Sequence, residues 1–146
     1  VPFKLQGEYM RSTTSRGGAF SDFTGTGAYV SAVWNVTGET WGYKAGVPTT
    51  PLPNEPGRGM LQLALRYDTM DLNDGSLNTS GATPVVTGVL GGEMDAWTVG
   101  ANWYLRSNFK LAANYVKVST SKYNSTAKAI VNDDPSIVEF RAQFFW

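Results

Sequence analysis

Apolar and polar residues alternate with a period of two over six segments of the chain, and turn-rich stretches separate these segments. Because successive side chains of a β-strand point to opposite sides, the alternation predicts strands with one apolar and one polar face. We therefore expect an all-β fold built from antiparallel strands. The predicted strands cover residues 3–12, 27–37, 60–68 and 94–105, a fifth strand that begins at residue 109, and residues 138–146.

The last of these segments carries the clearest signal. Its apolar face holds Val138, Phe140, Ala142, Phe144 and Trp146, while the residues between them are polar. A strand of an outer-membrane barrel turns such a face to lipid and its polar face to a wet lumen. The segment resembles the closing strand of bacterial outer-membrane proteins, whose terminal aromatic residue the barrel assembly machinery recognises. We therefore expect Val138, Phe140, Phe144 and Trp146 to form an assembly signal.

The aromatic residues of the apolar faces are sorted by their position along the strands. If residue 146 lies on the periplasmic side, the outward strands end their apolar faces in tyrosine, and the inward strands carry tryptophan near their inner ends. Aromatic rings at both ends of an aliphatic band are the girdles of a transmembrane barrel. A soluble β-sandwich or a lipocalin-like barrel, the alternatives for this pattern, has no physical reason to sort them. The predicted interface aromatics are Tyr9, Trp34, Tyr67, Trp97, Trp103, Tyr115 and Trp146.

The connections between the strands differ in length in a regular way. Residues 106–108 form a short turn on the side assigned to the periplasm, and polar loops at 13–25, 69–92 and 119–135 fall on the outer side. Short periplasmic turns and long outer loops are typical of outer-membrane barrels. The exception is the proline-rich connection 38–59, which is unusually long for a periplasmic turn and cannot run through a sheet interior.

Composition narrows the function classes. The 146 residues include 12 basic and 12 acidic ones, so no nucleic-acid partner is indicated. The chain has no cysteine and no histidine, which removes the usual zinc sites and the Ser-His and Cys-His nucleophile arrangements. The acids and amides at 68, 71, 73 and 74 lack the spacing of a calcium loop. We expect no enzyme activity, no metal and no cofactor.

Six strands are too few to close a barrel in a membrane. Single-chain bacterial barrels have eight or more strands, and an open edge in lipid leaves backbone amides without hydrogen-bond partners. The candidates for further strands inside the chain alternate poorly. We therefore expect residues 1–146 to be the C-terminal part of a single β-barrel domain whose remaining strands precede this segment.

Several pieces of the chain, taken in order, are similar to the C-terminal portion of the phosphate-selective porin O and P family. The resemblance implies a sixteen-stranded, usually trimeric porin of the Gram-negative outer membrane, to which this chain supplies about the last six strands. In this family a long late periplasmic turn folds inward and narrows the pore, and residues 38–59 stand at its place. The matching pieces are residues 37–39, 63–67, 71–75, 91–92, 97–105 and 114–116 together with the terminal aromatic.

The resemblance implies passive diffusion of small anions such as phosphate or polyphosphate. The family's arginine ladder and lysine ring lie largely in earlier parts of the chain and cannot be carried over. The cations expected on the polar faces, and hence the pore-lining candidates, are Lys4, Arg66, Lys110 and Arg141; Glu8, Asp68 and Glu139 share those faces. Charges of both signs are typical of a paired, solvated wall.

Two other functions stay open from the sequence. One is a non-selective general diffusion porin of the same fold, and the other is a structural or interaction barrel that anchors a surface layer or an adhesion partner. The expected partners in each case are outer-membrane lipid and lipopolysaccharide, the remaining strands of the barrel, the barrel assembly machinery and further copies of the chain in a homotrimer. If the protein is a porin, small anions are a further expected partner.

Overall fold

The computed structural model describes residues 1–18, 20–51, 53, 57–144 and 146. Its regular elements are nine β-strands, and no helical segment among the described residues has the length and apolar character needed to cross a membrane. The strands are β1 (Phe3–Thr14), β2 (Phe23–Asn35), β3 (Gly42–Lys44), β4 (Val47–Thr49), β5 (Met60–Asn78), β6 (Val85–Arg106), β7 (Phe109–Asn124), β8 (Ala129–Asp133) and β9 (Ser136–Phe144).

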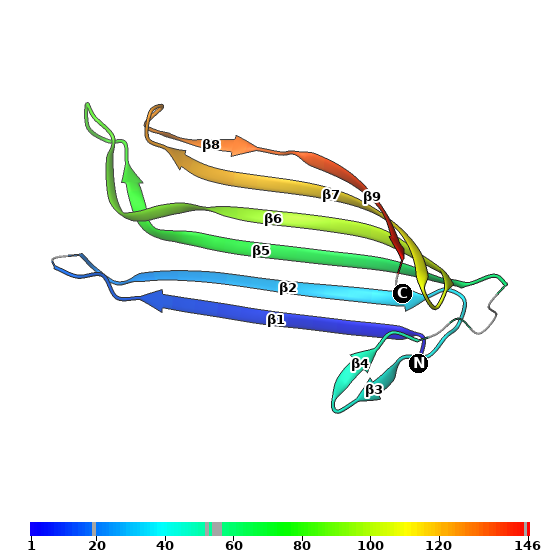
Figure 1. Cartoon of the computed structure of the whole chain (residues 1–146). Helices are drawn as coiled ribbons and strands as arrows, with labels where there is room; N and C mark the ends of the chain where they lie inside the picture. Colours follow the sequence, from blue (N-terminus) through cyan, green and yellow to red (C-terminus); the bar gives the residue numbers. More distant parts are fainter. Residues whose placement is uncertain (19, 52, 54–56, 145) are drawn as a thin grey trace.

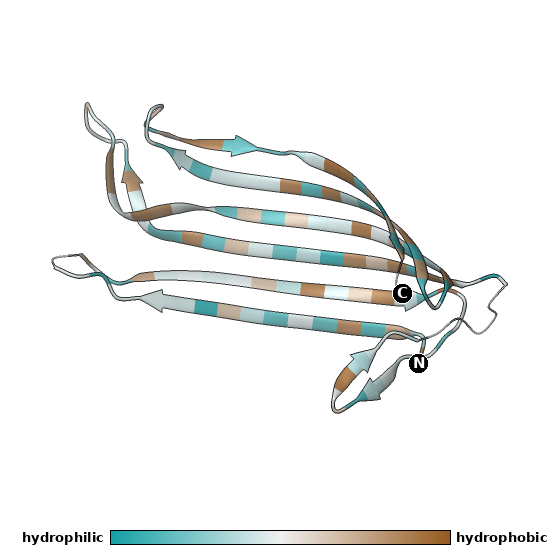
Figure 2. Ribbon diagram, viewed as in Figure 1, coloured by the Kyte–Doolittle hydropathy of each residue, from teal (hydrophilic) through white to brown (hydrophobic). Residues whose placement is uncertain are grey.

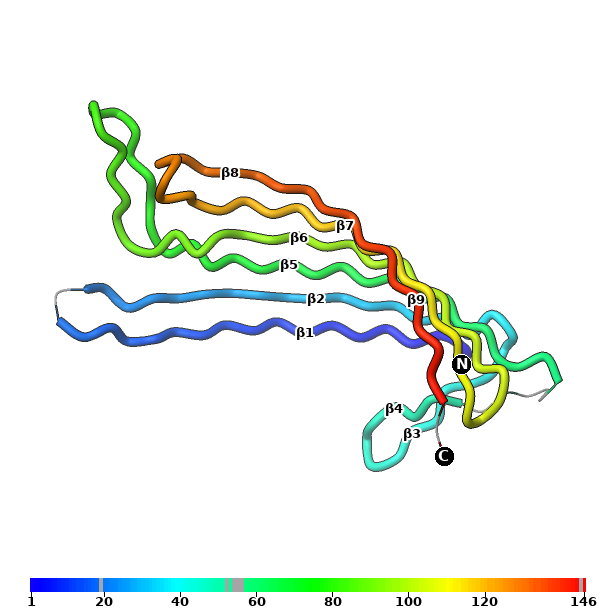
Figure 3. Tube along the Cα trace, turned by 45° about the horizontal axis from the view of Figure 1, so that its top comes forward, coloured from blue at the N-terminus to red at the C-terminus, as the bar shows by residue number. Residues whose placement is uncertain are grey.

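One antiparallel sheet holds all the strands except β3 and β4. Its order is β1-β2-β5-β6-β7, and β8 and β9 both pair with β7 at successive stretches, interrupted near Pro135. Figure 3 shows β8 and β9 following one path along β7. Within the described residues, β1 pairs only with β2 and β9 pairs only with β7, so the sheet is open at both edges.

The register brings the apolar faces of all the long strands to one side of the sheet. Figure 2 shows the alternation of hydrophobic and hydrophilic residues along these strands. Since a slip of one residue would turn a strand's apolar set to the other face, this alignment confirms the predicted phase of the pattern. One row of direct cross-strand neighbours on the apolar side is Leu5, Ala32, Leu65, Val99, Tyr115 and Val138.

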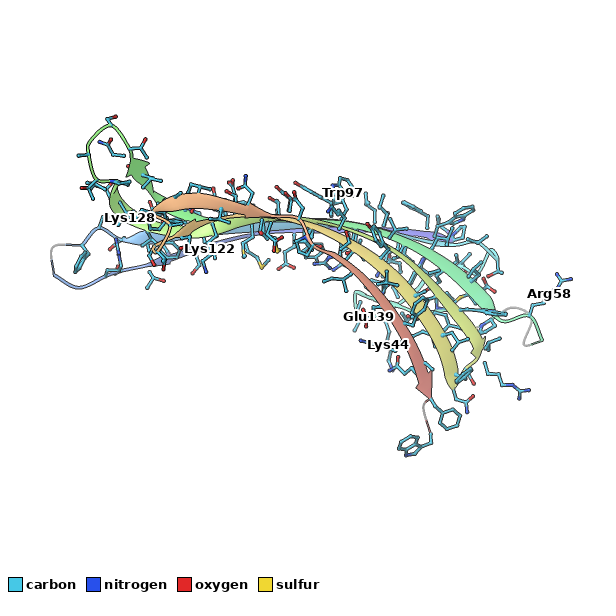
Figure 4. The ribbon with its side chains drawn as sticks, turned by 90° about the horizontal axis from the view of Figure 1, so that it is seen from above. Lys44, Arg58, Trp97, Lys122, Lys128 and Glu139 are labelled. Atoms are coloured by element: carbon cyan, nitrogen blue, oxygen red, sulfur yellow. The ribbon has the colours of Figure 1, made fainter. Side chains whose placement is uncertain are left out.

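The sheet is curved, and its two faces differ in chemistry. Figure 4 shows Trp97, from the apolar side, on the convex face, and Glu139, from the polar side, on the concave face. Large apolar side chains of the convex face are open to the surroundings, with Phe140 80% exposed. Among the described apolar residues, only Met60 and Ala96 are buried. The sheet therefore has no packed core of its own on the apolar side.

The strands predicted at 3–12, 60–68, 94–105 and from residue 109 onward lie within observed strands, whereas those predicted at 27–37 and 138–146 extend beyond the bounds of β2 and β9. The predicted outer loops were too long. β5 continues to Asn78 and β6 begins at Val85, so most of 69–92 is a two-stranded ribbon that extends beyond its neighbours. Its polar, apolar and glycine residues do not alternate regularly, yet the backbone ladder needs no apolar face, and Ser76 and Thr87 add a hydroxyl hydrogen bond of 2.8 Å. A register shift between Asp71 and Asn73 marks the start of the ribbon.

Two further boundaries were wrong. The predicted loop 119–135 contains the end of β7 and all of β8, and the predicted second strand stops at Asn35 rather than at residue 37, because the chain turns there. The proline-rich connection is not structureless: β3 and β4 form a small separate hairpin within it (Figure 1). Residues 52 and 54–56 of that connection lie outside the described residues.

Candidate functional site

The concave face carries all four predicted cations. The ladder register places Lys4, Arg66, Lys110 and Arg141 on the same side as Glu139, which Figure 4 shows on the concave face. They come from four different strands, β1, β5, β7 and β9. The sequence therefore predicted their shared face, but not what each side chain contacts.

Arg66 is neutralised by a carboxylate two residues further along its own strand. Its Nε lies 2.9 and 2.8 Å from the two carboxylate oxygens of Asp68, and its Nη2 lies 2.5 Å from Oδ1. The guanidinium also lies 4.1 Å from the centre of the Tyr29 ring on the neighbouring strand. A bidentate arginine–carboxylate pair stacked on an aromatic ring is well fixed and carries little net charge.

Arg141 has a similar partner. Its Nη2 lies 3.1 Å from Oε1 of Glu139, again two residues away on the same face, and Glu139 Oε2 accepts a 3.4 Å hydrogen bond from the Asn114 amide. Both side chains of this ion pair are exposed, so the pair is screened and weak, but its charges cancel locally.

The two lysines differ from the arginines. Lys4 Nζ lies 4.8 Å from the centre of the Trp41 ring, and Lys110 Nζ lies 5.3 Å from the centre of the Tyr104 ring. No carboxylate of the described residues forms an ion pair with either ammonium group. These two cations therefore contribute positive potential that no described acid cancels.

Lys44 is a third lysine that forms no ion pair with a described carboxylate, and the sequence analysis did not predict it. Lys44 ends β3, and Figure 4 shows it on the concave side of the sheet. The hairpin turns through Ala45 and Gly46, whose φ angles of 51° and 79° are those of a type I′ turn. The sequence does contain a signal for this hairpin: a glycine at the second turn position, between Tyr43-Lys44 and Val47-Pro48. It was overlooked because the prolines of this segment led to its assignment as a loop.

The connection that carries this hairpin is tied to the ends of the strands. Val36 N donates to Leu61 O (2.9 Å), and Trp41 N donates to Val1 O (3.2 Å). Where the connection returns, Trp103 Nε1 donates to Arg58 O (3.0 Å). Both termini also lie at this end of the sheet (Figure 1).

On the convex face, aromatic residues form two oblique rows. Phe3 and Tyr9, Trp103 and Trp97, and Phe109 and Tyr115 are each six residues apart along their strands, or about 20 Å. Tyr67 lies in the same row as Trp97, with ring centres 4.7 Å apart, and Trp34 pairs directly with Phe3. Six of the seven predicted interface aromatics thus belong to these rows, and the seventh, Trp146, is fully exposed beyond β9.

The residues of the predicted assembly signal lie at an open edge. Val138, Phe140 and Phe144 project from the convex face of β9, and all three are exposed. The Phe144 and Trp146 ring centres lie 6.3 Å apart. The described residues contain no group of three acids that could hold a metal ion.

The sequence profile of a family described as phosphate-selective porin O and P matches residues 1–146. The chain belongs to this family. It is 30% identical over 124 residues to a protein named Porin O from Pseudomonas aeruginosa, covering 83% of this chain and 28% of that protein. It is also 34% identical over 93 residues to an uncharacterised protein from Caulobacter vibrioides, covering 61% of this chain and 16% of that protein. The chain therefore spans about a sixth to a quarter of the length of these relatives.

We predict that Gly59→Ala destabilises this family member at the connection. Gly59 has φ of 73°, and a Cβ there would lie 2.3 Å from the carbonyl oxygen of Tyr104. The left-handed backbone alone costs an alanine about 1–2 kcal/mol of the free energy of unfolding, and the close contact adds to this. Urea unfolding of the full-length protein measures the change. Gly57→Ala is the control, because a Cβ at Gly57 meets no atom within 4 Å; equal stability of the two variants would contradict the prediction.

Proposed function

We propose that the intact protein is an outer-membrane porin through which small anions, such as phosphate or polyphosphate, diffuse passively. The observation that carries this proposal is the two-faced, curved sheet: apolar on its convex side across every long strand, and polar on its concave side, where Lys4, Lys44 and Lys110 form no ion pair with a described acid. In a closed barrel the convex side would face lipid and the concave side would line a water-filled channel.

The oblique aromatic rows support a tilted strand arrangement. Direct cross-strand pairing leads from Tyr9 on β1 through β2, β5 and β6 to Ser119 on β7. The aromatic residue of β7, Tyr115, lies four residues from Ser119, so the aromatic row shifts by four residues over four strand spacings. One residue of rise per strand spacing corresponds to a tilt of about 35° from the membrane normal. Strands of transmembrane barrels tilt by about 35–45°. The aromatics then lie at two constant heights, as a membrane interface requires.

The open edges support a larger barrel. β1 and β9 each offer one unpaired row of backbone groups, which hydrocarbon cannot satisfy. We propose that residues 1–146 form the C-terminal part of one barrel domain, that the remaining strands pair with these edges, and that the family's sixteen strands and trimer apply. Lipopolysaccharide would contact the end with the long β5–β6 ribbon, and the assembly machinery would bind β9.

The charges of the concave face support an anion preference. A selective pore needs cations that are not paired, and Arg66 and Arg141 are paired. Among the expected lining residues, Lys4 and Lys110 therefore carry the attraction for anions, and Lys44 joins them. All three come from the end of the sheet where the connection 36–59 lies.

The full-length protein, reconstituted in a planar bilayer, tests the function. We expect an ohmic current and a reversal potential, in a potassium phosphate gradient, that shows anion selectivity. Equal permeability to phosphate and chloride would indicate a general diffusion porin, and cation selectivity would contradict the anion proposal. A correctly inserted protein that passes no current would support a structural anchor instead.

Two arginine substitutions test the assignment of the faces. Val99→Arg places a charge in the middle of the convex face and should impair insertion by about 2–4 kcal/mol. Asn102→Arg places the same charge on the concave face of the same strand, where it should insert normally and increase anion selectivity. Folding yield in lipid vesicles measures the insertion of both variants. If the two variants insert equally well, the assignment of the faces is wrong.

A third substitution tests the pairing of Arg66. Asp68→Asn removes the carboxylate that cancels the Arg66 charge, so the anion-to-cation permeability ratio of the reconstituted channel should rise severalfold. Asp22→Asn removes an equal charge from the β1–β2 connection and should leave the ratio near that of the wild type. An unchanged ratio for Asp68→Asn would show that Arg66 does not act on the permeating ions.

A further inference from the structure

We propose that the buried pair Asn35 and Gln62, together with Thr37 and Glu39, holds residues 36–49 of the connection between β2 and β5 against the concave face and thereby sets the width of the channel. These are positioning residues, since they act through the connection and not on the permeating ion. The inference rests on the proposed porin function, because the channel exists only in the closed barrel.

The burial of these polar side chains sets them apart. On a sheet whose side chains are mostly open, Asn35 is 0% exposed, Glu39 is 2% exposed and Gln62 is 3% exposed. They are the buried polar residues of the described chain, and buried Met60 lies beside them at the start of β5. Neighbouring strands cannot cover the face of a sheet in this way. The cover at this end comes from the connection that runs between β2 and β5.

The hydrogen bonds join the strands to the connection in one chain of contacts. Gln62 Nε2 on β5 donates to Asn35 Oδ1 on β2 (2.9 Å), across a direct cross-strand pair. Asn35 Nδ2 then donates to the backbone oxygen of Glu39 in the connection (2.6 Å). A buried amide whose partner is removed must be hydrated or must shift, and a shift of Asn35 would disturb the hydrogen bond by which it holds Glu39.

Thr37 forms a second link between the same parts. Its hydroxyl accepts a hydrogen bond from Leu61 N (3.1 Å) and donates one to a carboxylate oxygen of Glu39. Together with the backbone bonds to Val1 and Leu61, these links attach the first half of the connection to β2, to β5 and to the residue that lies two positions before β1. Attachment at several points makes this part of the connection a fixed ledge and not a hinged lid.

The ledge also determines where charge stands in the channel. Trp41, within the connection, lies under the Lys4 ammonium group, and the hairpin that follows carries Lys44 to the concave side. If the attachment were broken, the steric obstruction and the position of these two lysines would both change. Width and selectivity are therefore coupled through the same buried amides.

Single-channel recording of the full-length protein tests this role. Gln62→Leu removes the donor to Asn35 and nearly preserves side-chain volume, so Asn35 should shift and the attachment of the connection through Glu39 should loosen. We expect the open-channel conductance to rise roughly 1.5-fold with added current noise, and a large organic anion to gain permeability relative to chloride. Gln143→Leu is the matched control, an amide on the concave face of β9 whose side chain has no hydrogen bond within the described residues; it should match the wild type.

A substitution at a second position ensures that the test does not depend on whether a single variant folds. Thr37→Val removes both side-chain bonds of Thr37 and should produce the same wider, noisier channel. The double variant Gln62→Leu/Thr37→Val should show a larger change than either single one, because the two substitutions remove different links to the same connection. Gel mobility with and without heating establishes that each barrel is folded.

The outcomes separate the two proposals. If the wild type conducts and folded Gln62→Leu and Thr37→Val channels keep its conductance, noise and size limit, the positioning role is overturned and the porin function stands. If the properly inserted wild type passes no current, the porin function fails and the positioning role fails with it.

Discussion

The register of one antiparallel ladder is the constraint on which the rest of the structure depends. Because side chains alternate with a period of two, a shift of one residue between any two strands would mix apolar and polar side chains on both faces. The observed pairings keep Leu5, Leu65 and Val99 on one side and Lys4, Arg66 and Asn102 on the other. The apolar convex face, the polar concave face and the oblique aromatic rows all follow from that single choice.

Much of this arrangement could be predicted from the sequence, because it depends on local periodicity. Alternation identified every long strand and the phase of each face. It failed where pairing does not depend on an alternating apolar face: in the ribbon from Asn73 to Leu90 the backbone hydrogen bonds are sufficient, and the short apolar run 85–90 alternates too poorly to have predicted a strand. The hairpin β3–β4 was missed for the related reason that the surrounding prolines dominate the pattern.

The candidate site was predictable in position but not in charge. The sequence placed four cations on the polar face, whereas their net effect depends on contacts two residues or many residues away. The pairing of Arg66 with Asp68 and of Arg141 with Glu139 could have been read from the i, i+2 spacing, which puts opposite charges on one face of a strand. The contact between Lys4 and Trp41 could not, since it depends on the path of a connection without periodic structure.

The connection between β2 and β5 and the sheet are linked by side chains of the sheet itself. Asn35 and Gln62 are part of the β2–β5 ladder, and their side chains meet only in the register that also aligns the apolar face. A slip of one residue would direct one of these amides to the convex side, among apolar side chains, and would leave the other without its partner. The hydrogen bonds that hold the connection therefore favour the same register as the apolar side chains of the convex face, so that the sheet and its attached connection are specified by one pairing.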